Sequence, residues 1–131
     1  MPGFEQSAMP KDLDFDGAFK GLRRLLKAYA PKLSVKLDTP DNYYLETKDV
    51  LRKGARLFVA AVQKKKNYVS LHLITIYMYP DLLRGLSPEL KRRKQGKACF
   101  NFTAPDPKLF AELDALIDAG FKAFKKRGLP V

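Results

Sequence analysis

The sequence predicts an α+β domain in which an antiparallel sheet of about five strands packs N- and C-terminal helices against one face. Two observations lead to this fold class. Apolar residues recur every three to four positions near both ends of the chain, whereas alternating or apolar runs fill its middle. Because these runs follow one another without intervening long helices, we expect one sheet face to stay open to solvent, a pocket or another subunit.

Length and composition are those of one folded domain. The chain has 131 residues, 46% of them hydrophobic, and 25 Lys and Arg exceed 14 Asp and Glu to give a net charge of +11. Pro and Gly in residues 1–12 indicate a loose arm, followed by a single domain over residues 13–131. The lone Cys99 excludes an internal disulfide.

Targeting and cofactor signals are weak throughout. The longest apolar run, residues 57–62, is far shorter than the ~20 residues that span a bilayer. The first twenty residues contain aspartates and no apolar stretch, so we expect no secretory signal. Glycine-rich phosphate loops are absent. We therefore expect a bacterial cytoplasmic protein with no membrane partner and no cofactor.

The first helix is expected to run from Phe15 to about Tyr29. Asp14 or Asp16 can cap its start, and Pro31 lacks the amide hydrogen needed to continue it. Its apolar face comprises Phe15, Phe19, Leu22, Leu26 and Tyr29.

Four strands should follow the first helix. Alternating and β-branched residues place them at 33–37, 43–47, 56–63 and 68–77. The turn-forming residues 38–42 should reverse the chain between the first two strands. The segment Lys64-Lys65-Lys66-Asn67 should join the last two as a hairpin.

Short helices should separate these strands from a fifth. Pro80 and Pro88 are suited to helix starts, with Ser87 as a cap for the second helix. Gly96 is suited to ending that helix. Alternation over residues 98–102 then predicts the fifth strand.

The last helix has the clearest pattern of all. Its apolar face comprises Leu109, Leu113, Leu116, Ile117, Phe121 and Phe124. Gly120 lies on the same face, where the missing side chain permits a close approach by the element packed there.

Strand parity predicts a cluster of polar side chains on the open face. His72 and Cys99 are the only residues of their kinds, and each alternates with apolar residues that should face the helices. Together they could form an activated thiol nucleophile, although they are too few to select a metal. The candidate ligand-binding residues are Tyr68, Ser70, His72, Lys97, Cys99 and Asn101, with Lys64 and Arg92 as charges on the rim.

Two further patterns have simpler readings. Residues 12–17 match the first half of a calcium-binding EF-hand loop, but the twelfth position, which needs a carboxylate, is Arg23. We therefore expect a capped helix start there and no metal site.

Basic clusters at residues 64–66, 84–97 and 125–127 could contact phosphate. Solvation of a turn and the helix dipole explain two of them equally well, so any nucleic-acid binding should be non-specific.

Residues 57–66, 68–72 and 96–102, followed by Pro107 and the final helix, resemble the YdhG-like family of small bacterial domains of unknown function. The resemblance covers about residues 15–127. It implies a frataxin-like outline, with helices on one face of an antiparallel sheet, and some members carry an iron-chaperone label. Where the family hairpin often has a histidine after its lysines, this chain has Asn67 and Tyr68.

These patterns favour a non-catalytic cytoplasmic module that binds a small anionic ligand or a protein partner on the open sheet face. Three alternatives stay open: an iron chaperone, a thiol enzyme, and nucleic-acid binding through the basic clusters. A large apolar open face would point to a dimer, and the sequence leaves the oligomeric state undecided.

Overall fold

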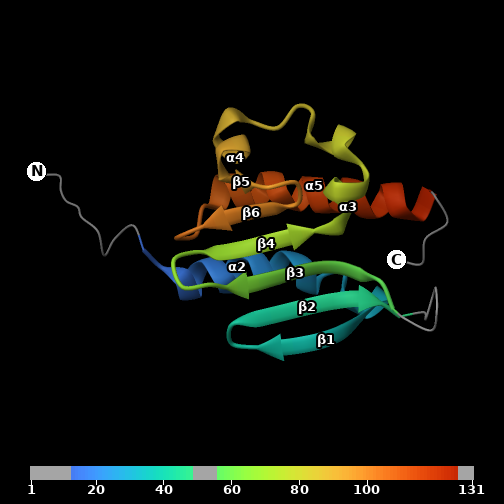
Figure 1. The fold of residues 1–131 in the computed structure, drawn as a ribbon, viewed down its shortest axis with the longest axis horizontal. Coiled ribbons are helices and arrows are strands. Elements are labelled where there is room, and N and C mark those ends of the chain that lie inside the picture. Colours follow the sequence, from blue (N-terminus) through green and yellow to red (C-terminus); the bar gives the residue numbers. More distant parts are fainter. Residues whose placement is uncertain (1–12, 49–55, 127–131) are drawn as a thin grey trace, which may run out of the picture.

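The structure, a computed structural model that describes residues 13–48 and 56–126, has two layers: a sheet and the helices behind it (Figure 1). It confirms the α+β class, with six antiparallel strands in place of about five. The expected arm over residues 1–12 lies outside the described residues. None of the described helices combines the length and apolar character needed to cross a membrane.

The strands lie in the order β1-β2-β3-β4-β6-β5, and every neighbouring pair is antiparallel. Consecutive hairpins therefore build most of the sheet, as the uninterrupted run of strand patterns predicts. Their bounds are β1 Leu33–Thr39, β2 Asn42–Thr47, β3 Phe58–Lys64, β4 Val69–Leu73, β5 Lys94–Gln95 and β6 Cys99–Phe102.

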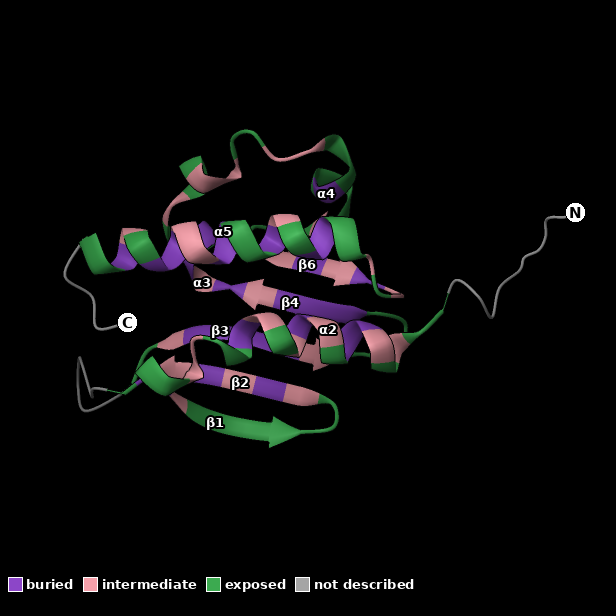
Figure 2. Cartoon of the chain, turned by 180° about the vertical axis from the view of Figure 1, so that it is seen from behind, coloured by how far each residue is buried: buried purple, intermediate pink, exposed green. Residues whose placement is uncertain are grey.

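Two long helices, α2 (Phe15–Lys27) and α5 (Pro107–Lys126), cover the same face of the sheet. Seen from behind, both lie in front of the strands, and buried positions alternate along them with exposed ones (Figure 2). The Asp14 carboxylate caps α2 by accepting a hydrogen bond from the Gly17 amide at 2.9 Å. The chain leaves α2 through the short 3-10 helix η1 (Ala30–Lys32), which contains Pro31.

The core lies between the helices and the inner face of the sheet. Apolar side chains from α2, α5 and every second strand position form one cluster. Its largest fully buried members are Tyr43, Phe100, Phe102, Leu22, Leu26, Leu45, Leu71, Leu73, Ile76, Leu90, Leu113 and Ile117. Both long helices bury their apolar faces in this cluster, so neither of them covers the other side of the sheet.

The expected strand over residues 68–77 is wrong in its second half. β4 ends at Leu73, and Ile74–Met78 form the short helix α3. A continuous apolar run does not distinguish a strand from a buried helical segment, and here the packing decides. Thr75 and Ile76 of α3 are buried.

The region after α3 differs from expectation in its details. Pro80 begins the 3-10 helix η3 (Pro80–Leu83), and Pro88 begins α4 (Pro88–Arg93) with the expected Ser87 cap. Gly96 does not end α4. Residues Lys94–Gln95 form the extra strand β5, and Gly96, with φ of +65°, occupies the turn into β6.

A β-bulge interrupts the pairing of β2 with β3. Leu45 pairs with Ala60, whereas the next residue, Glu46, pairs with Phe58. Val59 is therefore an extra residue, and both Val59 and Ala60 join the core cluster. The bulge shifts the side-chain alternation of β3 by one position, so Phe58 emerges on the face opposite the helices.

Gly120 of α5 permits the close approach that the sequence predicts, and the element packed there is α3. A Cβ at this position would lie 2.5 Å from Oγ1 of the buried Thr75. We expect Gly120→Ala to lower the free energy of unfolding by about 1–3 kcal/mol, because the overlap outweighs the gain in helix propensity. Urea unfolding measures the change. In a Thr75→Ala background the loss should shrink, and a stabilising Gly120→Ala in the unaltered chain would contradict the packing.

Candidate functional site

The uncovered face of the sheet gathers four of the residues that parity predicts. His72 of β4 lies directly opposite Cys99 of β6, and Ser70 lies opposite Asn101. Directly opposed residues of an antiparallel pair share a face. Because Leu71 and Phe100, which alternate with them, are fully buried in the core, these four side chains belong to the face away from the helices.

Three rings form a line across this face, here called the aromatic row: Tyr44, Phe58 and His72. The ring centroids of Tyr44 and Phe58 are 5.0 Å apart, and those of Phe58 and His72 are 4.7 Å apart. Both pairs are tilted by 50°, so the rings do not cover one another by parallel stacking. All three are partly exposed.

The aromatic row depends on a small residue and the bulge. Cross-strand pairing runs from Tyr44 to Ala61 and from Ala61 to His72. Alanine leaves space between the two outer rings, and the Phe58 ring lies against both of them. Strict alternation from Ala61 would turn Phe58 toward the helices, which explains why sequence reasoning missed it. Tyr44 was also missed, although it alternates with the buried Tyr43 and Leu45.

A second line of paired residues, here called the polar row, lies beside the aromatic row. Successive cross-strand pairs place Thr39, Asn42, Gln63, Ser70 and Asn101 on the same face. The side-chain oxygens of Asn42 and Asn101 are inaccessible and have no hydrogen-bond partner among the described residues. The open face therefore offers amide and hydroxyl groups along one line and rings along the other.

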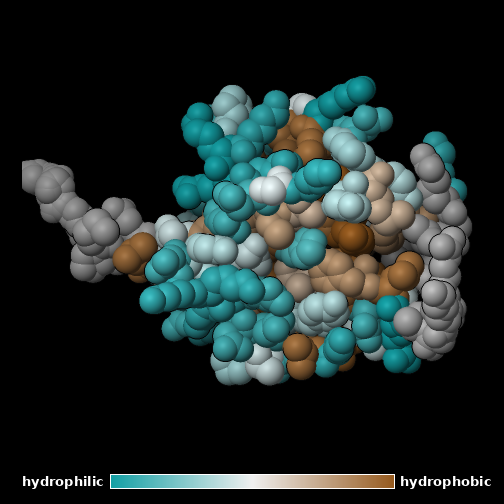
Figure 3. Space-filling view, viewed as in Figure 1, coloured by the Kyte–Doolittle hydropathy of each residue, from teal (hydrophilic) through white to brown (hydrophobic). Residues whose placement is uncertain are grey.

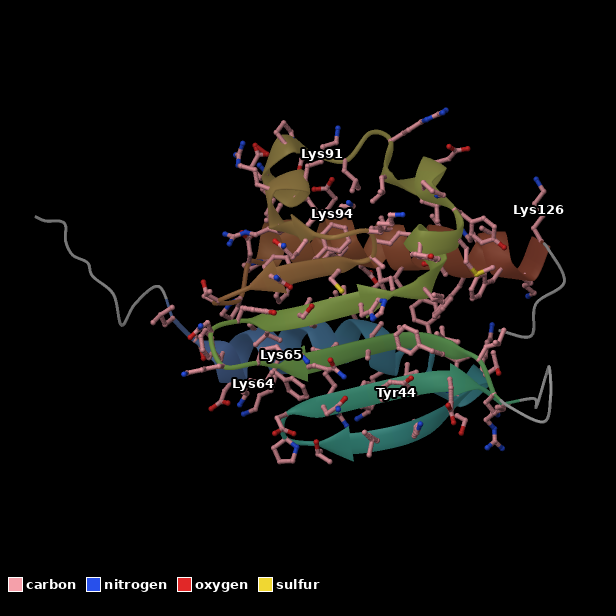
Figure 4. The ribbon with its side chains drawn as sticks, in the orientation of Figure 1. Tyr44, Lys64, Lys65, Lys91, Lys94 and Lys126 are labelled. Carbon is pink, nitrogen blue, oxygen red and sulfur yellow. The ribbon has the colours of Figure 1, made fainter. Side chains whose placement is uncertain are left out.

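Cations surround both rows. The Lys36 amine lies 5.2 Å from the centroid of the Tyr44 ring. The basic rim comprises Lys36, Lys65, Lys66 and Lys97, from β1, the β3–β4 turn and the β5–β6 turn. Tyr44 lies on β2, between β1 and β3, and Lys65 lies toward the end of β3 (Figure 4). Lys94 of β5 is not part of this rim, because it pairs with the buried Phe100 and its amine donates to the Gly96 carbonyl at 2.6 Å. Hydrophobic surface lies in the middle of this view, with hydrophilic side chains to its left, above it and below it (Figure 3).

Acidic groups are scarce on this face. Of the two acids in the described strands, Asp38 turns to α2, where Arg23 binds it in a bidentate ion pair with a shortest distance of 2.8 Å. Only Glu46 remains for the open side among these strand residues. The ion pairs among the described residues include no member of the basic rim.

The two predicted rim charges lie elsewhere. Lys64 alternates to the helix side, where its amine forms an ion pair with Asp16 of α2. Arg92 lies on α4 and lines a hollow with Asp106 and Leu109 at the start of α5. Neither side chain borders the open face. Strand alternation turns Lys64 toward α2, and the sequence does not predict where α4, which carries Arg92, lies in space.

The remaining two predicted residues lie in turns. Tyr68 precedes β4 and is 36% exposed, and its carbonyl accepts a hydrogen bond from the Lys65 amide. Lys97 is exposed in the turn between β5 and β6. Lys97 therefore belongs to the border of the face, and Tyr68 lies at the end of the strand that carries Ser70 and His72.

Burial is the main influence on the protonation of His72. Desolvation lowers the pKa of its imidazole below the ordinary value of 6.5, because burial disfavours the charged form. No hydrogen bond among the described residues joins it to the Cys99 thiol, and the Phe58 ring lies against it instead. A thiol enzyme that uses these two groups stays a prediction.

No group of three or more His, Cys, Asp or Glu side chains suited to a metal ion occurs within residues 13–48 and 56–126. Of the EF-hand-like aspartates, Asp14 caps α2 and Asp16 binds Lys64, while Asp12 lies outside the described residues. The polar side of α2 carries Lys20, Arg24 and Lys27. Iron binding stays a prediction that no geometry in the described part of the chain favours.

The open face is a surface and not a pocket. Four hollows on the described part of the molecule are lined by neither His72 nor Cys99 nor any ring of the aromatic row. One of them, of about 520 Å³ between α2 and the β1–β2 turn, includes Thr39 at the end of the polar row. His72 and Cys99 therefore share a face without sharing any of these cavities. Such a surface suits an extended partner better than an enclosed small molecule.

The lowered pKa of His72 predicts a pH dependence of stability. As pH falls below 6.5 the unfolded chain takes up this proton first, so the free energy of unfolding should fall until the lower folded pKa is reached. Urea unfolding between pH 5 and 7.5 should show this component in the unaltered protein and lack it in His72→Gln. An imidazole that titrates above 6.5 by NMR would refute the assigned burial.

Searches with the chain found no matching family model, no matching curated protein and no matching solved structure. The resemblance to the YdhG-like family therefore stays a prediction. Its implied outline, helices on one face of an antiparallel sheet, agrees with the fold described above. Its implied iron-chaperone role gains no support from these searches.

Proposed function

We propose that this chain is a non-catalytic cytoplasmic module that binds an anionic partner on the open face of its sheet. The observation that carries the proposal is the basic rim around a surface that holds aromatic and amide side chains. Charges of one sign around such a surface attract ligands of the opposite sign and raise their rate of association. The half-exposed Cys99 thiol is compatible with a reducing compartment such as the cytoplasm.

The charge distribution supports an anion over a second copy of the chain. Each copy carries a net charge of +11, so two open faces brought together would oppose their basic rims. Like charges across an interface disfavour association. An anionic partner instead meets lysines that have no ion pair among the described residues.

The shape of the face supports a partner with an extended surface. The two rows cross adjacent strands without enclosing a cavity, and their side chains are mostly partly exposed. A small anion would remain largely in water at such a place, whereas an extended partner contacts several strands at once.

A heparin column tests the proposal. We expect retention at ~0.15 M salt, and Lys65→Gln/Lys66→Gln should elute at lower salt, with up to about fivefold weaker binding for each lysine. The matched control is Lys27→Gln/Lys108→Gln, which removes the same charge from exposed positions on the helix side. Equal losses in both variants would show binding by net charge alone, and no retention would remove the proposal.

A further inference from the structure

We propose that the anionic partner is a single-stranded nucleic acid whose bases stack on the aromatic row while its phosphates lie along the basic rim. This inference rests on the proposed function and specifies the class of ligand. Proteins bind single strands by combining aromatic side chains, on which bases stack, with a positively charged track for the backbone. The open face places both features on the same few strands.

The aromatic row has the dimensions for this contact. Tyr44, Phe58 and His72 come from three adjacent strands, which lie about 4.8 Å apart, so the row extends over roughly 10 Å. That length accommodates about two bases. Each ring is partly exposed, and the 50° tilts between neighbours leave ring surface that no other ring of the row covers.

The polar row supplies groups that bind the edges of bases. The amides of Asn42, Gln63 and Asn101 each carry both donors and acceptors, and single-stranded bases present both on their Watson–Crick edges. The oxygens of Asn42 and Asn101 are inaccessible from the surface. The partly exposed Gln63 is therefore the amide of this row that is placed to accept a hydrogen bond from a base.

Duplexes and acidic proteins fit these features less well. The base faces of a duplex are covered by neighbouring bases, so only its phosphates could use this surface. An acidic peptide could bind the lysines but brings no repeating flat rings for Tyr44, Phe58 and His72. A single strand is complementary to both features, because its phosphates can contact the basic rim while its exposed base faces stack on the aromatic row.

Fluorescence anisotropy with labelled 12-nucleotide single strands of DNA and RNA of mixed sequence tests the inference. Tyr44→Leu and Phe58→Leu keep an apolar side chain but remove the ring, and each should weaken binding by about tenfold or more. The matched control is Tyr29→Leu, which removes a partly exposed ring from the helix side and should leave binding unchanged. Thermal unfolding confirms that each variant is folded.

Several outcomes would overturn the inference and leave the proposed function standing. One is weaker oligonucleotide binding in Lys65→Gln/Lys66→Gln with unchanged binding in both ring variants. Others are equal affinity for a duplex of the same sequence, or tighter binding of poly-glutamate than of either single strand. A dimer in light scattering that Phe58→Leu dissociates would instead assign the open face to a second copy and overturn the proposed function as well. Loss of all polyanion binding would instead remove both proposals.

Discussion

The structure depends on one constraint: both long helices bury their apolar faces on the same side of a single sheet. Every strand then has an inner position that must be apolar and an outer position that meets solvent. The inner positions hold the core, from Tyr43 and Leu45 to Leu71 and Phe100. The outer positions are free of this demand. Packing of the core therefore does not determine which side chains, such as His72 and Cys99, occupy the outer positions.

This constraint explains how much of the molecule its sequence predicts. Helical spacing and strand alternation are local, so they predicted the fold class, α2, α5 and the shared face of Ser70, His72, Cys99 and Asn101. The end of β4 was missed because Leu73 and Ile74 are equally apolar, and only the packing of α3 against Gly120 separates strand from helix. The two-residue strand β5 is too short to have a period.

The candidate site was predicted only in part, because its composition depends on pairing between residues that are distant in the sequence. Phe58 reaches the open face because of a bulge that appears only when β2 and β3 pair. Lys64 is tied to Asp16, 48 residues away, and Asp38 is tied to Arg23, so two charges near the sheet belong to the helix side. Alternation along one strand predicts neither a bulge between two strands nor an ion pair between distant residues.

The energetic balance of the open face also argues for a contact with another molecule. Partly exposed rings leave apolar surface in water, which favours association with another surface. Shielded amide oxygens without partners are unfavourable in an isolated domain, because they have lost their hydrogen bonds to water. The helix layer shows that this chain satisfies such groups elsewhere: the Glu112 carboxylate accepts two hydrogen bonds of 2.7 Å from Ser87. Lysines around the rings oppose self-association, while they attract anions. The same arrangement thus disfavours contact between copies of the chain and leaves the partly exposed rings accessible to a partner of opposite charge, as the proposed function requires.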